Sequence, residues 1–241
     1  MRYYYDLHIH STLSPCGDED NSPNNIVGMA SLCGLNILAL TDHNTAKNCP
    51  AFFAAAKKYD IIPIAGMELT TSEDIHVICL FENLSDALSF DDFVESNRIK
   101  VKNRPEIFGH QTVMNDDDEP LFEVEDLLIY ASNISIENVS EVVSSYGGIC
   151  YPAHIDRDAN GIIAILGTLP DYGFDLYELN DGSKKEKYSV KYNIDKDRFI
   201  VSSDAHYLTA IKDKENYLDL DCNGNDPQTV RRCLFRYLRR K

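Results

Sequence analysis

Histidines and carboxylates gather in short clusters along the chain, with the spacing of metal ligands. An HxH pair lies near the start and a DxH pair near the end. Residues two apart in an extended strand share one face, so each pair can offer two ligands to one ion. Imidazole suits zinc, iron and manganese, and carboxylates can bridge ions, so we predict two or three divalent metal ions. The candidate ligands are His8, His10, His43, Glu68, His76, His154, Asp204 and His206.

A mixed cluster of this kind indicates hydrolytic chemistry. Ions held about 3.5–4 Å apart can generate a hydroxide nucleophile and clamp the oxygens of a phosphoester, so no side-chain nucleophile is required. Glu68 is the candidate for the bridging carboxylate. The alternative is one structural zinc, which would need about four ligands, more typically cysteine pairs. That alternative leaves half of the cluster unexplained.

The residues between the clusters predict the elements that position them. Helical patterns at 23–33 and 48–59 separate apolar stretches, and alternating strands and helices favour a parallel sheet. In a parallel barrel, functional groups follow the strands, as these candidates do, except that His76 opens its strand. The seven expected strands are 3–9, 36–41, 61–65, 76–81, 149–153, 174–179 and 199–202.

The stretch from about 82 to 147 departs from this alternation. Helical patterns around 85–101, 123–130 and 135–146 predict a helical insertion within one domain that spans 1–241. The acidic run at 116–119 lacks the spaced ligands and central glycine of a calcium loop, so we expect a solvated turn. A capped helix is expected at 226–241, packing its stripe of Val230, Leu234, Tyr237 and Leu238 on the barrel.

Composition limits the class of protein. With 23 basic and 39 acidic residues, the net charge of −16 repels nucleic acid and anionic membranes unless bound metals reverse the sign locally. Seven cysteines without a CxxC pair are typical of reduced thiols. The sequence lacks the apolar pattern of a signal peptide or a bilayer span, so we expect a cytoplasmic protein without a membrane partner or an obligate protein partner.

Five short motifs together resemble the PHP (polymerase and histidinol phosphatase) family of metal-dependent phosphoesterases. They are DLHIHS at 6–11, TDHN at 41–44, GME at 66–68 with His76, PAH at 152–154 and SDAH at 203–206. The resemblance implies an α/β fold, a distorted (β/α)7 TIM-like barrel. It also implies a first ion held by His8, His10, Glu68 and Asp204, a second by Glu68, His76 and His154, and a third by His43 and His206.

The resemblance leaves the third ion in question. Cys16 stands where many members have a further histidine ligand. A thiolate there would favour zinc, whereas a neutral thiol would leave the ion weakly held, and both alternatives stay open. The carboxylates of Asp6 and Asp42 are expected to accept hydrogen bonds from ligating histidines and to fix their orientation.

The implied activity is hydrolysis of small phosphomonoesters or of nucleotide and oligonucleotide phosphates. Glu68, Asp204 and His206 would be catalytic. The leaving oxygen would be protonated by a metal-bound water, or by His206 if its metal site is empty, and both alternatives stay open. Arg157 is expected to bind the substrate phosphate, with an exposed loop arginine as the alternative. Rival functions are a histidinol-phosphatase-like enzyme, an amidohydrolase, and a non-catalytic metal-binding regulatory domain.

Overall fold

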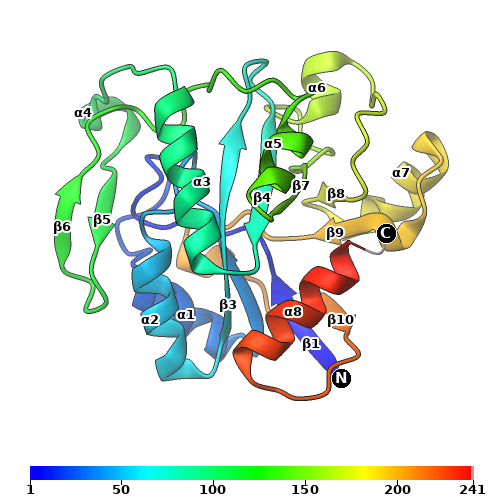
Figure 1. Cartoon of the computed structure of the whole chain (residues 1–241), viewed down its shortest axis with the longest axis horizontal. Coiled ribbons are helices and arrows are strands. Elements are labelled where there is room, and N and C mark those ends of the chain that lie inside the picture. Colours follow the sequence, from blue (N-terminus) through cyan, green and yellow to red (C-terminus); the bar gives the residue numbers. More distant parts are fainter. Residues whose placement is uncertain (240–241) are drawn as a thin grey trace.

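The strands of the barrel curve around a shared interior in the computed structural model, which describes residues 1–239 (Figure 1). A six-stranded sheet has the order β10-β1-β2-β3-β4-β7, and β8 pairs with β9 in parallel. A bridge between Ile9 and Ala205 joins the chain after β9 to the chain after β1. The fold is the expected distorted TIM-like barrel, and all seven predicted strands are present. The core strands are β1 (Arg2–Asp6), β2 (Ile37–Leu40), β3 (Ile62–Thr70), β4 (His76–Phe81), β7 (Ile149–Pro152), β8 (Tyr177–Leu179) and β9 (Phe199–Val201), with β10 (Tyr217–Asp219) beside β1.

Strand β4 runs against its neighbours, so the expectation of a wholly parallel sheet is wrong at this position. It pairs antiparallel with both β3 and β7, with His76 opposite Thr70 and Val77 opposite Pro152. The connection between β3 and β4 is a tight turn, too short for a parallel crossover. The start of β4 therefore lies beside the ends of β3 and β7. This direction explains why His76 opens its strand and still joins the other candidates.

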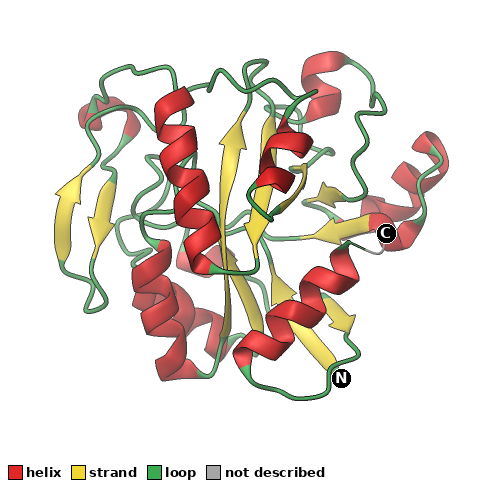
Figure 2. Ribbon diagram, viewed as in Figure 1, coloured by secondary structure: helices red, strands yellow, loops and turns green. Residues whose placement is uncertain are grey.

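Helices cover the outside of the barrel (Figure 2). In α1 (Pro23–Leu32), the Ser22 side chain accepts a hydrogen bond from the backbone N–H of Asn25, which is the expected N-cap. Helix α2 (Cys49–Tyr59) packs on α1 and β3, while α3 (Leu84–Asn97) contacts β3 and β4. The remaining helices of the wall are α5 (Val139–Ser145), α6 (Ile162–Leu166) and α7 (Lys185–Tyr192), and short 3-10 helices lie at Gly182–Lys184, Lys196–Arg198 and Leu208–Ala210.

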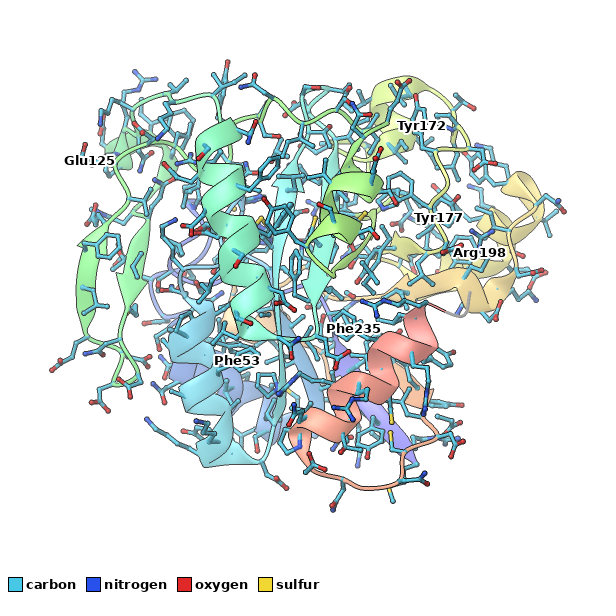
Figure 3. All side chains as sticks on the ribbon, in the orientation of Figure 1. Phe53, Glu125, Tyr172, Tyr177, Arg198 and Phe235 are labelled. Atoms are coloured by element: carbon cyan, nitrogen blue, oxygen red, sulfur yellow. The ribbon has the colours of Figure 1, made fainter. Side chains whose placement is uncertain are left out.

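Helix α8 (Pro227–Leu238) closes the end of the barrel where β1 and β2 begin (Figure 1). Its buried residues Val230, Leu234 and Leu238 join the interior cluster, as the stripe predicts, and Tyr237 packs partly buried against that cluster. Phe235, marked on α8 in Figure 3, is buried as well. The expected continuation of this helix through residues 240 and 241 lies outside the described residues.

The segment between β4 and β7 is only partly helical, which corrects the prediction for this insertion. Helix α4 (Pro105–Phe108) precedes a hairpin of β5 (Thr112–Met114) and β6 (Pro120–Glu123). The helix expected at 123–130 is absent from this described stretch. The buried Gln111 side chain donates to the carbonyls of Val124 and Asp126 and accepts from the N–H of Leu128. In a helix the Val124 carbonyl would pair with the Leu128 N–H, and here Gln111 satisfies both groups instead.

The acidic run forms the turn of the β5–β6 hairpin. Asp116 and Asp117 are exposed, as expected for a solvated turn. Asp118 is half-buried and accepts hydrogen bonds from the Ser22 hydroxyl and the Asn24 backbone, so it anchors the start of α1. None of the described helices combines the length and the apolar character needed to cross a bilayer.

Candidate metal centre

All eight candidate ligands come together at one end of the barrel. His8 and His10 follow β1, and His154 follows β7. Glu68 lies within β3, which is longer than predicted, and it pairs through a parallel bridge with His43 after β2. Seven of the eight are buried, and His206 keeps a side-chain exposure of 23%. The cavity at their centre has a volume of about 150 Å³.

The Glu68 carboxylate occupies the middle of the cluster. Its Oε1 lies 2.9 Å from His76 Nδ1, 3.1 Å from His154 Nε2 and 3.3 Å from His8 Nε2, and its Oε2 lies 3.1 Å from His43 Nδ1 and 3.4 Å from His10 Nε2. Burial alone would raise the pKa of Glu68, but the nearby imidazoles of His76, His8 and His43 lower it well below its usual value. Each oxygen faces a different set of imidazoles, which is the arrangement a bridging carboxylate requires.

The Asp204 carboxylate is a second acidic group in the cluster, and it lies beside His8 and His10. Its Oδ1 lies 3.2 Å from His8 Nε2 and 3.3 Å from His10 Nε2. The two imidazole nitrogens themselves are 3.1 Å apart. Donor atoms of these three residues fall within 4.8 Å of one another, as do those of His43, Glu68 and His76.

Several buried donor atoms at this place have no hydrogen-bond partner among the described residues. They are Nδ1 of His43, His76 and His154, and Oδ1 of Asp204. The Nδ1 atoms of His43 and His76 approach Glu68 closely, yet without the direction that a hydrogen bond needs. Unpaired buried polar atoms are costly, so convergent lone pairs of this kind fit cations placed between them. The donor set is therefore suited to divalent metal ions.

Two of the candidate ligands have a strained backbone. His154 has φ of 26° and Asp204 has φ of 54°, both in the left-handed region that favours glycine. Such a conformation costs about 1–3 kcal/mol and persists where the surrounding structure holds it. The Ile9–Ala205 bridge holds the chain beside Asp204, and the backbone N–H of His154 is bound by a buried carboxylate.

That carboxylate is Glu178 on β8, which the sequence analysis missed. Its Oε2 lies 2.9 Å from His8 Nδ1 and accepts the His154 N–H at 3.0 Å. The contact requires a proton on Nδ1 of His8, so the neutral ring would offer its Nε2 lone pair to an ion shared with Glu68 and Asp204. The one available signal was an acidic residue in an otherwise apolar strand, since Tyr177 and Leu179 flank it.

Asp42 acts on His10 through a serine, which modifies the expectation of a direct contact. The Ser14 hydroxyl donates to Asp42 Oδ1 at 2.7 Å, so its lone pair accepts from His10 Nδ1 at 2.9 Å. Asp6 accepts hydrogen bonds from the backbone N–H groups of His8 and Ser203 rather than from an imidazole ring. Asp6 therefore joins the two chain segments that carry the HxH and DxH pairs.

Cys16 lies within reach of the third group of candidates. Its sulfur and donor nitrogens of His10, His43 and His206 are all within 4.8 Å of one another. Cys16 is an exposed residue, yet desolvation by the surrounding protein, followed by the negative charge of Glu68, raises the pKa of its thiol. The next residue, Gly17, has no room for a Cβ, which would lie 2.4 Å from the Ser11 carbonyl oxygen. A hydrogen bond from Asp18 N–H to the His206 carbonyl ties this loop to a candidate ligand.

Arg157 reaches the centre, but its partner there is a candidate ligand. The guanidinium is 47% exposed and forms an ion pair with Asp204 Oδ2. Lys184, a cation that follows β8, is instead paired with Asp156 at 3.0 Å. Arg157 thus lies at the central cavity, and its role toward phosphate stays a prediction.

Comparisons with known proteins agree with this geometry. The profile of the PHP domain family matches residues 6–165. A 5′-3′ exoribonuclease of Haemophilus influenzae is 40% identical over 83 residues, which are 33% of this chain and 29% of that protein. This chain therefore spans less than a third of the length of that curated relative.

Solved structures share the fold at low sequence identity. A lesion-specific endonuclease from Pyrococcus furiosus aligns with a TM-score of 0.64 at 18% identity, over 96% of this chain and 55% of that one. A Bifidobacterium adolescentis protein provisionally described as a metal-dependent phosphoesterase aligns with a TM-score of 0.58 at 19% identity, over 96% of both chains. At these identities the likeness concerns the fold alone.

Proposed function

This chain belongs to the PHP domain family, and on that premise we propose that it is a divalent-metal-dependent phosphoester hydrolase. The proposed substrates are nucleotide or oligonucleotide phosphates, or small phosphomonoesters. The observation that carries the proposal is the convergence of five imidazoles on the single carboxylate of Glu68. One curated relative is described as an exoribonuclease, which supports a phosphoester substrate.

We assign the ligands in three overlapping groups. The first holds His8, His10 and Asp204, with Glu68 shared between the first group and the second. The second contains Glu68, His76 and His154, and the third contains Cys16, His43 and His206. The geometry also brings His43 into the group of Glu68 and His76, so His43 is placed to serve two groups. Zinc, manganese and iron all suit this donor set.

When bound, divalent ions would supply a hydroxide nucleophile at neutral pH and neutralise charge on the phosphoryl oxygens. The chain's own residues would orient the ligating imidazoles and bind the substrate phosphate. Glu178 and Ser14 fix which ring nitrogen of His8 and His10 carries the proton. Arg157 reaches the Asp204 carboxylate, so its guanidinium can reach an anion bound in the same cavity, and we assign it to the substrate phosphate.

His206 is the least buried imidazole of the cluster, which makes it the candidate for contact with the leaving group. Its Nδ1 lies 2.9 Å from the Asp204 carbonyl oxygen and must donate to it. The Nε2 atom of the neutral ring therefore carries a lone pair, which suits metal binding. His206 would serve as the proton donor only after protonation of Nε2.

The test is hydrolysis by the full chain after chelation and after reconstitution with zinc, manganese or iron. The probes are p-nitrophenyl phosphate, bis(p-nitrophenyl) phosphate and a short oligonucleotide, with metal content measured on the same samples. We expect activity to disappear on chelation and to return with at least one metal. Full activity without metal would contradict the proposal. Stoichiometric metal without hydrolysis of any probe would favour a non-catalytic metal-binding domain.

A further inference from the structure

A second cavity, of about 780 Å³, adjoins the metal centre. It shares three lining residues with the central cavity, His76, Ile129 and Asn160. The Asn160 carbonyl accepts the His76 N–H at 2.8 Å, so the boundary between the two cavities is fixed to a candidate ligand. A molecule bound in the second cavity therefore lies directly beside the metal centre. Most of the remaining wall comes from the insertion between β4 and β7.

About half of the residues that line this cavity are apolar, and several of these are partly open to solvent. Ile99, Val101, Phe108 and Tyr130 are 39–45% exposed, and all four line it. Large apolar side chains that stay exposed and gather around one hollow indicate a binding surface. Two of the four are aromatic, so the cavity can offer ring faces as well as apolar area.

Two cations, Arg104 and Lys102, line this cavity although the chain as a whole is strongly acidic. The Arg104 guanidinium lies 5.8 Å from the centre of the Phe108 ring, and among the described residues it has no carboxylate partner. Lys102 is paired with Glu125, which Figure 3 marks at this edge of the molecule, at 2.6 Å. Arg104 is thus the cation available to a negatively charged ligand.

We propose that this cavity binds the nucleoside part of a nucleotide substrate whose phosphate lies at the metal centre. The inference rests on the proposed function and names the substrate class for the same site. The base would pack against Phe108 and Tyr130, and Arg104 would face a further phosphate or the ring π-system. The volume lies within the roughly 300–1,000 Å³ typical of small-molecule sites. A small sugar or amino-alcohol phosphate would leave the aromatic wall without a partner.

Another cavity, of about 460 Å³, lies on the Cys16 side of the centre and gives a natural comparison. Tyr207 lines it, but so do the carboxylates of Asp18 and Glu19, which disfavour an anionic nucleotide. The cavity of the insertion has one carboxylate in its lining, Asp74, and two cations, Lys102 and Arg104, so the charges favour it. Tyr207 is 57% exposed and provides a matched aromatic control.

The experiment compares adenosine 5′-monophosphate with ribose 5-phosphate, which carries the same phosphomonoester without the base. The variants are Phe108→Ala, Tyr130→Ala and the control Tyr207→Ala, each checked for unchanged thermal unfolding. We expect the wild type to prefer the nucleotide by about tenfold or more in kcat/KM. Loss of either cavity ring should reduce that preference about fivefold through KM, and Tyr207→Ala should leave it unchanged.

Binding of adenosine 5′-monophosphate in the presence of manganese, measured by calorimetry, tests the cavity independently of turnover. Weaker binding in both cavity variants would support the proposal even if hydrolysis of every phosphoester fails, a result that would count against the proposed function alone. Equal use of nucleotide and ribose 5-phosphate would overturn it. So would unchanged nucleotide affinity in Phe108→Ala and Tyr130→Ala, or a loss confined to Tyr207→Ala.

Discussion

Glu178 Oε2 lies 2.9 Å from His8 Nδ1, and the same oxygen accepts the backbone N–H of His154. One buried carboxylate thus fixes two proposed ligands that follow different strands, β1 and β7. It orients the His8 ring and supports the strained backbone at His154. Because Glu178 holds two proposed ligands in place, we expect it to affect metal affinity without binding a metal ion itself.

Glu178→Gln should weaken metal binding about 10- to 100-fold, because a glutamine amide can no longer both accept the His8 proton and carry negative charge. Competition with a chromogenic chelator measures this affinity. The control is Glu186→Gln, which removes an exposed carboxylate in α7. Equal metal affinity in both variants would show that His8 is oriented by other contacts.

Ser14→Ala should also weaken metal binding, by breaking the path from Asp42 to His10. The hydroxyl accepts from His10 Nδ1 at 2.9 Å and donates to Asp42 at 2.7 Å, so its loss leaves a buried carboxylate short of a donor. We expect about tenfold lower affinity for at least one ion, with less effect on the others. Ser145→Ala, at an exposed position, is the control. Metal titrations that superimpose for the two variants would contradict the prediction.

Glu68→Gln should have the largest effect of the ligand variants, since its carboxylate faces five imidazoles. We expect the purified variant to lose at least about one ion per chain and most of its hydrolytic rate. Elemental analysis alongside the rate assay is the measurement. Retention of both metal content and rate would remove Glu68 from the bridging role.

Cys16 can be tested by its reactivity. If its sulfur binds the third ion, zinc should protect it from alkylation, and Cys16→Ser should lower the metal content by about one ion per chain. Labelling is followed at individual residues by mass spectrometry, with the half-buried Cys222 as the internal reference. Equal labelling of Cys16 with and without zinc would show that its sulfur does not bind the ion.

Local pattern was sufficient to predict most of the fold. Each predicted strand is present because apolar runs between turn residues mark strands that are buried on both faces. The direction of β4 was not predictable from its composition, which is similar for parallel and antiparallel strands. The helix expected at 123–130 failed for a different reason. Gln111 competes for the same backbone groups from outside the segment, and no local pattern reports that contact.

The candidate site also has residues that the sequence predicted and residues that it did not. The ligands stand in pairs and short motifs, so sequence alone marked His8, His10 and Asp204, which the structure brings together. Glu178 has no such companion, because its partner His8 lies 170 positions away in the chain. The role of Ser14 was not predictable from the sequence either. It depends on contacts with His10 and Asp42 that form only when the loop after β1 folds against Asp42.

Arg157→Ala should raise KM for phosphoesters more than it lowers kcat, because a guanidinium that holds the phosphate in both ground and transition states contributes uniform binding. A charge-assisted hydrogen bond contributes about 1.5–3 kcal/mol, so kcat/KM should fall roughly 10- to 100-fold. The structure adds a second consequence. Arg157 is the cation paired with Asp204, so removing it should leave that carboxylate at least as available to metal.

Metal content must therefore be measured in the Arg157→Ala protein, and we expect it to be retained. Lys184→Ala is the matched control, because that ammonium group lies near the same end of the barrel but is paired with Asp156. A change in kcat/KM below about twofold in fully metallated Arg157→Ala would make this arginine an exposed loop residue. A larger loss in Lys184→Ala would instead transfer the phosphate contact to the loop after β8.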